Sequence, residues 1–136
     1  MQNRYVGGIG DYLKLGILRA LSPGYHLCAA WWLFPDEAHN RDGRHIGYLD
    51  RPDVWRHFDP KLFDTLRGMV SSGQRSVGEL EAANILPGAA FASEFIPTGG
   101  AKARGQQVRS EWLEDVQRKL DRANLSTSAW ERRTSS

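Results

Sequence analysis

Apolar residues recur with a helical period near the start of the chain. Leu13, Ile17 and Leu21 are four positions apart, which predicts a helix with these side chains on its buried face. Asp11 follows a glycine-rich turn and is predicted to cap the start of this helix. Pro23 ends the helix, because a proline has no N–H for a hydrogen bond inside a helix.

Residues 25–34 form a short, continuous apolar run that is rich in aromatic side chains. Turn-forming residues flank the run on both sides, as is typical of a strand that is buried on both faces. Further short strands are predicted at residues 45–49, 85–86 and 91–96, next to Gly and Pro positions.

Three later helices carry their own signals. Asp59 followed by Pro60 is an N-cap with proline at the first helical position. Ser76 and Glu79 have the spacing of a capping box, which opens a short helix. A last helix is predicted over residues 105–123. Its apolar face is formed by Val108, Trp112, Val116 and Leu120.

Strands that alternate with helices favour an α/β architecture. The sequence therefore predicts a single three-layer α/β domain over residues 1–125, with a Rossmann-like sheet flanked by helices. The apolar period is lost after Leu125, so residues 126–136 are predicted to be a frayed tail.

Composition narrows the class of protein. The 136 residues allow one hydrophobic core, and the net charge of +2 gives no argument for nucleic-acid binding. The single cysteine, Cys28, excludes an internal disulfide. No signal peptide is visible, and the longest apolar run is too short to span a bilayer, so a cytoplasmic location without membrane contact is predicted.

Residues 35–45 carry the densest group of reactive side chains. The carboxylates of Asp36, Glu37 and Asp42 suit a divalent metal ion, and a metal-activated water would hydrolyse a phosphoester. His39 or His45 would act as general base, because the unperturbed pKa of an imidazole lies near neutrality. Glu37 counts among both the metal ligands and the catalytic candidates.

Four further residues are predicted to bind substrate. Asn40 and Arg44 belong to the same polar segment, whereas Asp11 and Lys14 follow a glycine-rich turn whose N–H groups could hold a phosphate. That turn has neither a dinucleotide-binding nor a Walker A pattern. In the structural alternative, residues 36–45 are a surface loop held by Asx-turns, and residues 7–11 are a turn with a helix cap.

Three segments carry a family resemblance, namely residues 7–19, 32–45 and 59–66. They resemble an uncharacterised family of bacterial and phage-associated proteins whose pattern opens GDxGDFxKYGLLR and continues through PDExHNxDGRH. The likeness extends over residues 4–125. Members continue with an apolar strand and a DPDNG-like acidic turn, which are absent here, so the resemblance implies a C-terminally truncated chain. The unpaired sheet edge that this leaves would favour a homodimer.

Three hypotheses about function follow. The first is a metal-dependent enzyme that acts on nucleotides or nucleic acid through residues 36–45. The second, which the resemblance implies, is a methyltransferase-like fold that binds S-adenosylmethionine. The third is a non-enzymatic phage or defence protein whose loop is an interaction surface.

Overall fold

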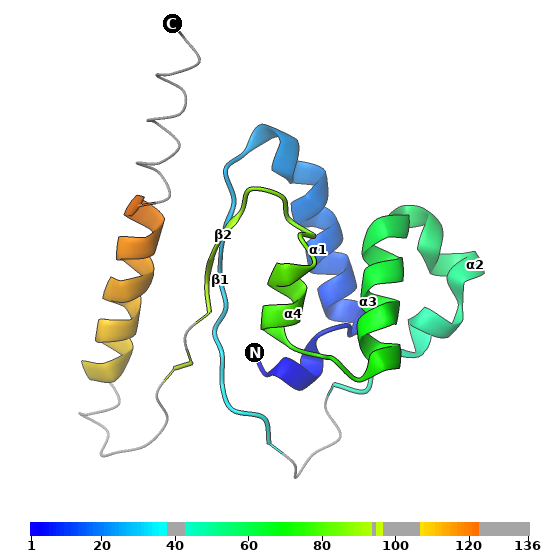
Figure 1. The fold of residues 1–136 in the computed structure, drawn as a ribbon, viewed down its shortest axis with the longest axis horizontal. Helices are drawn as coiled ribbons and strands as arrows, with labels where there is room; N and C mark the ends of the chain where they lie inside the picture. The colour runs from blue at the N-terminus through cyan, green and yellow to red at the C-terminus, as the bar shows by residue number, and fades with distance from the viewer. Residues whose placement is uncertain (38–42, 94, 97–106, 123–136) are drawn as a thin grey trace, which may run out of the picture. The chain divides into compact units, whose positions relative to one another are not determined.

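The computed structural model describes residues 1–37, 43–93, 95–96 and 107–122, and these form two compact units (Figure 1). Each unit combines two separate stretches of the chain. The first contains residues 1–27 and 35–88, and the second contains residues 28–34 together with the chain from residue 89 onward.

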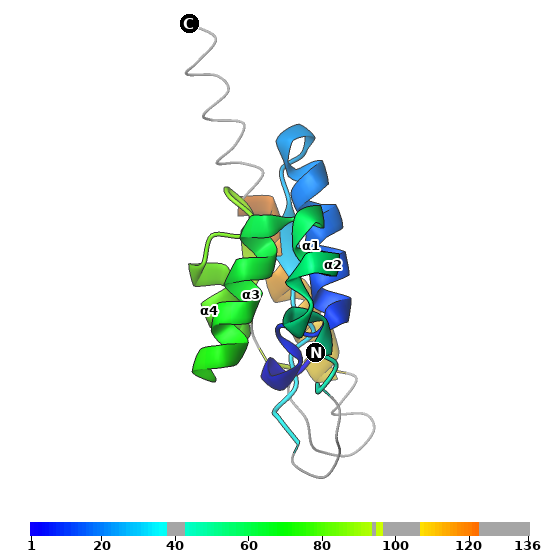
Figure 2. The same cartoon turned by 90° about the vertical axis from the view of Figure 1, so that its right-hand side faces the viewer.

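The first unit is helical. Its α-helices are α1 (Ile9–Leu21), α2 (Pro52–Trp55), α3 (Pro60–Ser72) and α4 (Val77–Ala82). Short 3-10 helices join them, namely η1 (Asn3–Tyr5), η2 (Ser22–Gly24), η3 (Gly47–Asp50) and η4 (Arg56–Phe58). Helices α1 and α3 lie side by side in both views (Figures 1 and 2).

Helix α3 supplies the centre of the core of this unit. Leu62, Phe63 and Leu66 are fully buried, and the ring of Phe63 packs edge-on against Tyr12 and Tyr48. Burial of such large apolar side chains is the main term that favours folding. The apolar stripe at the surface of α3 therefore faces the rest of the unit.

The predicted starts of α3 and α4 are confirmed. The side chain of Asp59 accepts a hydrogen bond from the Leu62 N–H (3.1 Å), and that of Ser76 accepts one from the Glu79 N–H (3.0 Å). Both signals depend only on residues three positions apart, so they form wherever the local sequence allows them.

Helix α1 is present, but the predicted buried face is wrong. Leu13, Ile17 and Leu21 are 52%, 63% and 48% exposed, whereas Tyr12 and Leu15 are buried. The helix has apolar residues on two sides, and periodicity alone does not say which side meets α3. The predicted cap is also wrong, because Gly8 is the N-cap residue and Asp11 lies inside the first turn.

The second unit contains a two-stranded parallel sheet of β1 (Cys28–Ala30) and β2 (Ala90–Ala92). An isolated bridge joins Leu33 to Phe95, in the same parallel sense. Residues 107–122 are helical, as predicted. The core of the unit consists of Ala92, Ile96, Trp112 and Val116, with Phe34 and Leu120 packed against it.

The prediction of a three-layer, Rossmann-like α/β fold is wrong. Within the described residues the structure is mainly helical, and its sheet has two strands of three residues each. The run at 25–34 yields only β1, and Trp32 within it is exposed. The segment at 45–49 contains η3, and buried residues Ile85 and Leu86 lie outside any strand. The methyltransferase-like hypothesis depended on the larger sheet.

Short apolar runs explain this error. A run of four to ten apolar residues fits a buried strand, a buried turn or part of a helix equally well. The predicted tail at residues 126–136 lies outside the described residues. Among the described helices, none is long and apolar enough to cross a membrane.

Two leucines on α1 test which face of the helix is buried. Leu15→Ala is expected to lower the free energy of unfolding by about 2–5 kcal/mol, because it leaves a cavity in the core. Leu13→Ala, the matched control, should cost less than about 1 kcal/mol, as surface substitutions do. Urea denaturation measures both values. The reverse ranking would return the buried face to Leu13, Ile17 and Leu21.

Candidate functional site

A hollow of about 440 Å³ lies at the start of α1, and we call it the α1 hollow. Three of the residues that the sequence singled out, Asp11, Lys14 and His45, line it together. The remaining lining residues are Tyr5, Gly8, Ile9, Gly10 and Gly43. Its volume falls in the range of sites that bind small molecules.

Two glycines allow the walls of the α1 hollow to approach each other. Gly7 has a φ of +87°, and a Cβ there would lie 2.7 Å from Cγ2 of Val70. Gly43 has a φ of +84°, and its Cβ would lie 2.6 Å from the carbonyl oxygen of Arg4. Both positions therefore require glycine, for backbone conformation and for space.

A backbone hydrogen bond then brings His45 to the start of α1. The Ile9 N–H donates to the carbonyl oxygen of His45 over 2.9 Å. This bond satisfies one of the N–H groups that a helix leaves unpaired at its first turn. The imidazole of His45 is consequently held beside Asp11 and Lys14, although the residues are far apart in the sequence.

Arg75 and Tyr48 fix the backbone behind the α1 hollow. The Arg75 guanidinium donates from Nε to the Val6 carbonyl (2.7 Å) and from Nη2 to the Gly43 carbonyl (2.8 Å). The Tyr48 hydroxyl donates to the Gly7 carbonyl over 3.0 Å. These bonds join the N-terminal segment to the segment that carries His45.

Asp11 is the unusual group of the site. It is only 6% exposed, and its Oδ1 pairs with Nζ of Lys14 at 3.2 Å. Its Oδ2 is buried without a hydrogen-bond partner among the described residues. Burial raises the pKa of Asp11 above the ordinary value, although Lys14, Arg75 and the Gly7 backbone act in the opposite direction.

An unsatisfied buried oxygen destabilises a fold by about 1–3 kcal/mol. Carboxyl groups with this kind of environment gather at functional sites, where a perturbed pKa serves chemistry or binding. Asp11 therefore marks the α1 hollow as the strongest candidate site among the described residues.

The other predicted site residues do not meet Asp11. The Asp36 carboxylate accepts a hydrogen bond from the Arg4 N–H (3.3 Å), and the Glu37 carbonyl accepts one from the Arg4 side chain. Arg44 is exposed and does not line the α1 hollow. Three predicted residues lie outside the described part of the chain, namely His39, Asn40 and Asp42.

The metal-binding prediction is wrong for the part of the chain that the structure describes. No group of three or more His, Cys, Asp or Glu side chains there is arranged to hold a metal ion. Closeness in sequence misled here, because the Asp36 carboxylate is engaged by the backbone of Arg4 while His45 lies at the start of α1.

Sequence reasoning missed Arg75 and Tyr48. Neither belongs to a motif, and each acts on backbone carbonyls that only the folded chain brings within reach. Gly43 carried a weak signal, because an Asp-Gly pair often marks a turn.

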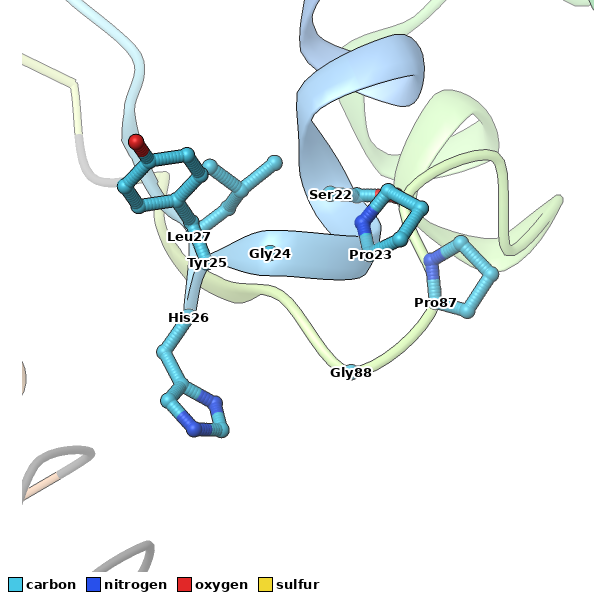
Figure 3. Close-up of a pocket in the computed structure, with 8 residues that line it drawn as sticks. All are labelled: Ser22, Pro23, Gly24, Tyr25, His26, Leu27, Pro87 and Gly88. Atoms are coloured by element: carbon cyan, nitrogen blue, oxygen red, sulfur yellow. The ribbon is translucent and has the colours of Figure 1, made fainter.

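Two other hollows in the first unit carry less chemistry. One, of about 340 Å³, is lined by Pro23, Tyr25, His26 and Pro87 with neighbouring residues, and the His26 ring points away from both prolines (Figure 3). The other is an apolar groove of about 300 Å³ along α1. Neither brings a carboxyl, an ammonium and an imidazole together as the α1 hollow does.

Comparison with protein-family models, with curated proteins and with solved structures gives no match to this chain. The family resemblance of residues 4–125 therefore stays a prediction. Function has to be argued from the site itself.

Asp11→Asn tests the energetic state of the carboxyl. The pKa of Asp11 is raised in the folded protein, so its ionised form is less stable there than in the unfolded chain. At neutral pH the substitution removes this cost, and the Tm should be higher than that of the wild type. The difference should shrink as the pH falls through the pKa of Asp11, where the wild type becomes neutral.

Circular dichroism melts between about pH 4 and pH 7 measure this effect, since acidic groups titrate across that range. Asp53→Asn is the matched control, because Asp53 also lies in the first turn of a helix but is exposed. A lower Tm for Asp11→Asn than for the wild type at neutral pH would contradict the prediction.

Proposed function

We propose that the α1 hollow binds a small hydroxylated ligand of nucleoside or nucleotide size, with Asp11 and His45 as the groups that exchange protons with it. One observation carries the proposal. A buried carboxyl with an unpartnered oxygen adjoins a hollow that an ammonium and an imidazole also line.

A ligand hydroxyl would supply the hydrogen bond that Oδ2 of Asp11 lacks. The Lys14 side chain covers the carboxyl but is itself 69% exposed, so its movement opens the carboxyl to the α1 hollow. A hydroxyl that donates to a carboxylate makes a charge-assisted bond, which is stronger than a bond between neutral groups. Binding would thus recover free energy that the fold gives up at Asp11.

His45 supports a role in proton transfer. Its side chain is exposed and lines the same hollow, where a bound ligand would meet it. General acid–base catalysis requires such a group within hydrogen-bonding reach of the reacting atom, either directly or through one water. The proposed chemistry is therefore acid–base chemistry on a polar ligand. The cytoplasmic location stays a prediction from the sequence.

A thermal-shift panel tests the binding function. Nucleosides, nucleoside monophosphates and simple sugars are each added in the presence of EDTA, and at least one compound should raise the Tm. A ligand at 100 times its Kd stabilises a protein by about 2.7 kcal/mol, a shift that is easily measured. Asp11→Ala should abolish the shift, whereas Asp53→Ala should leave it intact. A panel without any Asp11-dependent shift would refute the proposal.

A second candidate function rests on the apolar groove along α1. Leu13, Ile17 and Phe58 are exposed at this groove, and Gly16 and Ala20 leave a hollow beside them. A ridge of large side chains next to a row of small ones is complementary to a copy of itself. We propose that a second copy of the chain docks here, which agrees with the homodimer predicted from the sequence.

Ile17→Asp tests this candidate. Light scattering after gel filtration should give the mass of a dimer for the wild type and of a monomer for the variant, because a charge at a dimer interface is strongly disfavoured. Gln74→Asp is the control, since Gln74 is exposed and lies away from the groove. A wild type that is monomeric at high concentration would exclude the dimer.

A further inference from the structure

The surroundings of the α1 hollow favour a negatively charged ligand group. We propose that its ligand carries an oxoanion, such as a phosphate, sulfate or carboxylate group, and that Asp11 binds this group as the neutral acid. This inference rests on the binding function proposed above, and it specifies the chemical class of the ligand.

Positive charge prevails around Asp11. Lys14 pairs with it directly, and Arg75 is close enough to affect its titration. The hollow also lies at the N-terminus of α1, a helix of 13 residues, where the helix dipole favours an anion. Gly8 and Gly10 line the hollow without side chains, so an anion can approach the backbone N–H groups.

The carboxyl itself is the second and independent observation. An ionised Asp11 would repel an anion, but the neutral acid donates a hydrogen bond to one. Its Oδ2 is the atom without a partner in the buried side chain, and a proton placed there would find an acceptor in the ligand. Because burial already raises the pKa of Asp11, protonation on binding requires little free energy.

The anion would therefore enter together with one proton from solvent. No covalent bond forms or breaks, and the proton stays on Asp11 while the anion is bound. Affinity should rise as the pH falls, since a larger fraction of the protein then carries the neutral acid.

Other titratable groups face Asp11 from the surrounding elements. They are Lys14 of α1, Tyr48 of η3, Arg75 after α3, the amino group of Met1, and His45, which lines the same hollow. Lys14 and Arg75 keep their charge over the mildly acidic range, and burial raises the pKa of Tyr48, which stays neutral. His45 is the main competing proton acceptor, because histidines titrate near neutral pH.

Calorimetry with sulfate tests the inference, because sulfate does not itself take up protons at neutral or mildly acidic pH. Titrations in two buffers with different heats of ionisation give the number of protons taken up for each sulfate bound. The wild type should take up a proton as it binds, with higher affinity at lower pH. His45→Gln should retain this uptake.

Two variants carry the interpretation. Asp11→Asn keeps a hydrogen-bond donor without a titrating proton, so it should bind sulfate with no proton uptake and no dependence on pH from this group. Lys14→Ala should bind roughly tenfold more weakly, because a charge-assisted hydrogen bond is lost. Lys61→Ala is its matched control, since Lys61 is an exposed lysine in the first turn of α3. Circular dichroism checks that each variant folds.

Four results would overturn the inference. They are binding without proton uptake, uptake that persists in Asp11→Asn, uptake that disappears in His45→Gln, and equal weakening by Lys61→Ala and Lys14→Ala, which would indicate an adventitious ion only. If sulfate fails to bind while a neutral nucleoside or sugar binds through Asp11, the oxoanion is excluded and the proposed function stands. If neither binds, both proposals fail.

Discussion

The Arg75 guanidinium holds together the part of the first unit on which everything else at the site depends. One side chain donates to the Val6 and Gly43 carbonyls, and so joins the residues before α1 to the residues before η3. Its planar group offers donors in a fixed geometry that a lysine could not reproduce. Without this link, the bond from Ile9 to the His45 carbonyl would have to hold the two segments with little help.

The same arrangement explains why Asp11 is tolerated in a buried place. The Arg75 and Lys14 charges offset part of the cost of removing a carboxylate from water, but burial still has the larger effect on its pKa. Proteins retain destabilising groups of this kind where function requires them, and stabilising substitutions at such positions commonly reduce activity. The stability of the first unit and the chemistry of the α1 hollow are therefore opposed at one residue.

Sequence reasoning succeeded where the signal was local. The caps at Asp59 and Ser76 depend on residues three positions apart, and both were predicted correctly. It failed where a choice depended on distant partners, as for the buried face of α1, and where a short apolar run was taken for a long strand. Asp11, Lys14 and His45 were each selected as candidates, but from two separate motifs. Their meeting depends on Gly43 and Arg75, whose contacts leave no periodic pattern in the sequence.

The parallel pairing of β1 with β2 has a consequence for the order of folding. The strands are joined by residues 31–89, so the chain must close a long loop before their first hydrogen bonds can form. Loop closure of this length is entropically unfavourable unless the intervening chain is already compact. The helices of the first unit, which are rich in local contacts, can form early and bring residues 27 and 89 toward each other. We expect the small sheet to be among the last elements to form and the first to open.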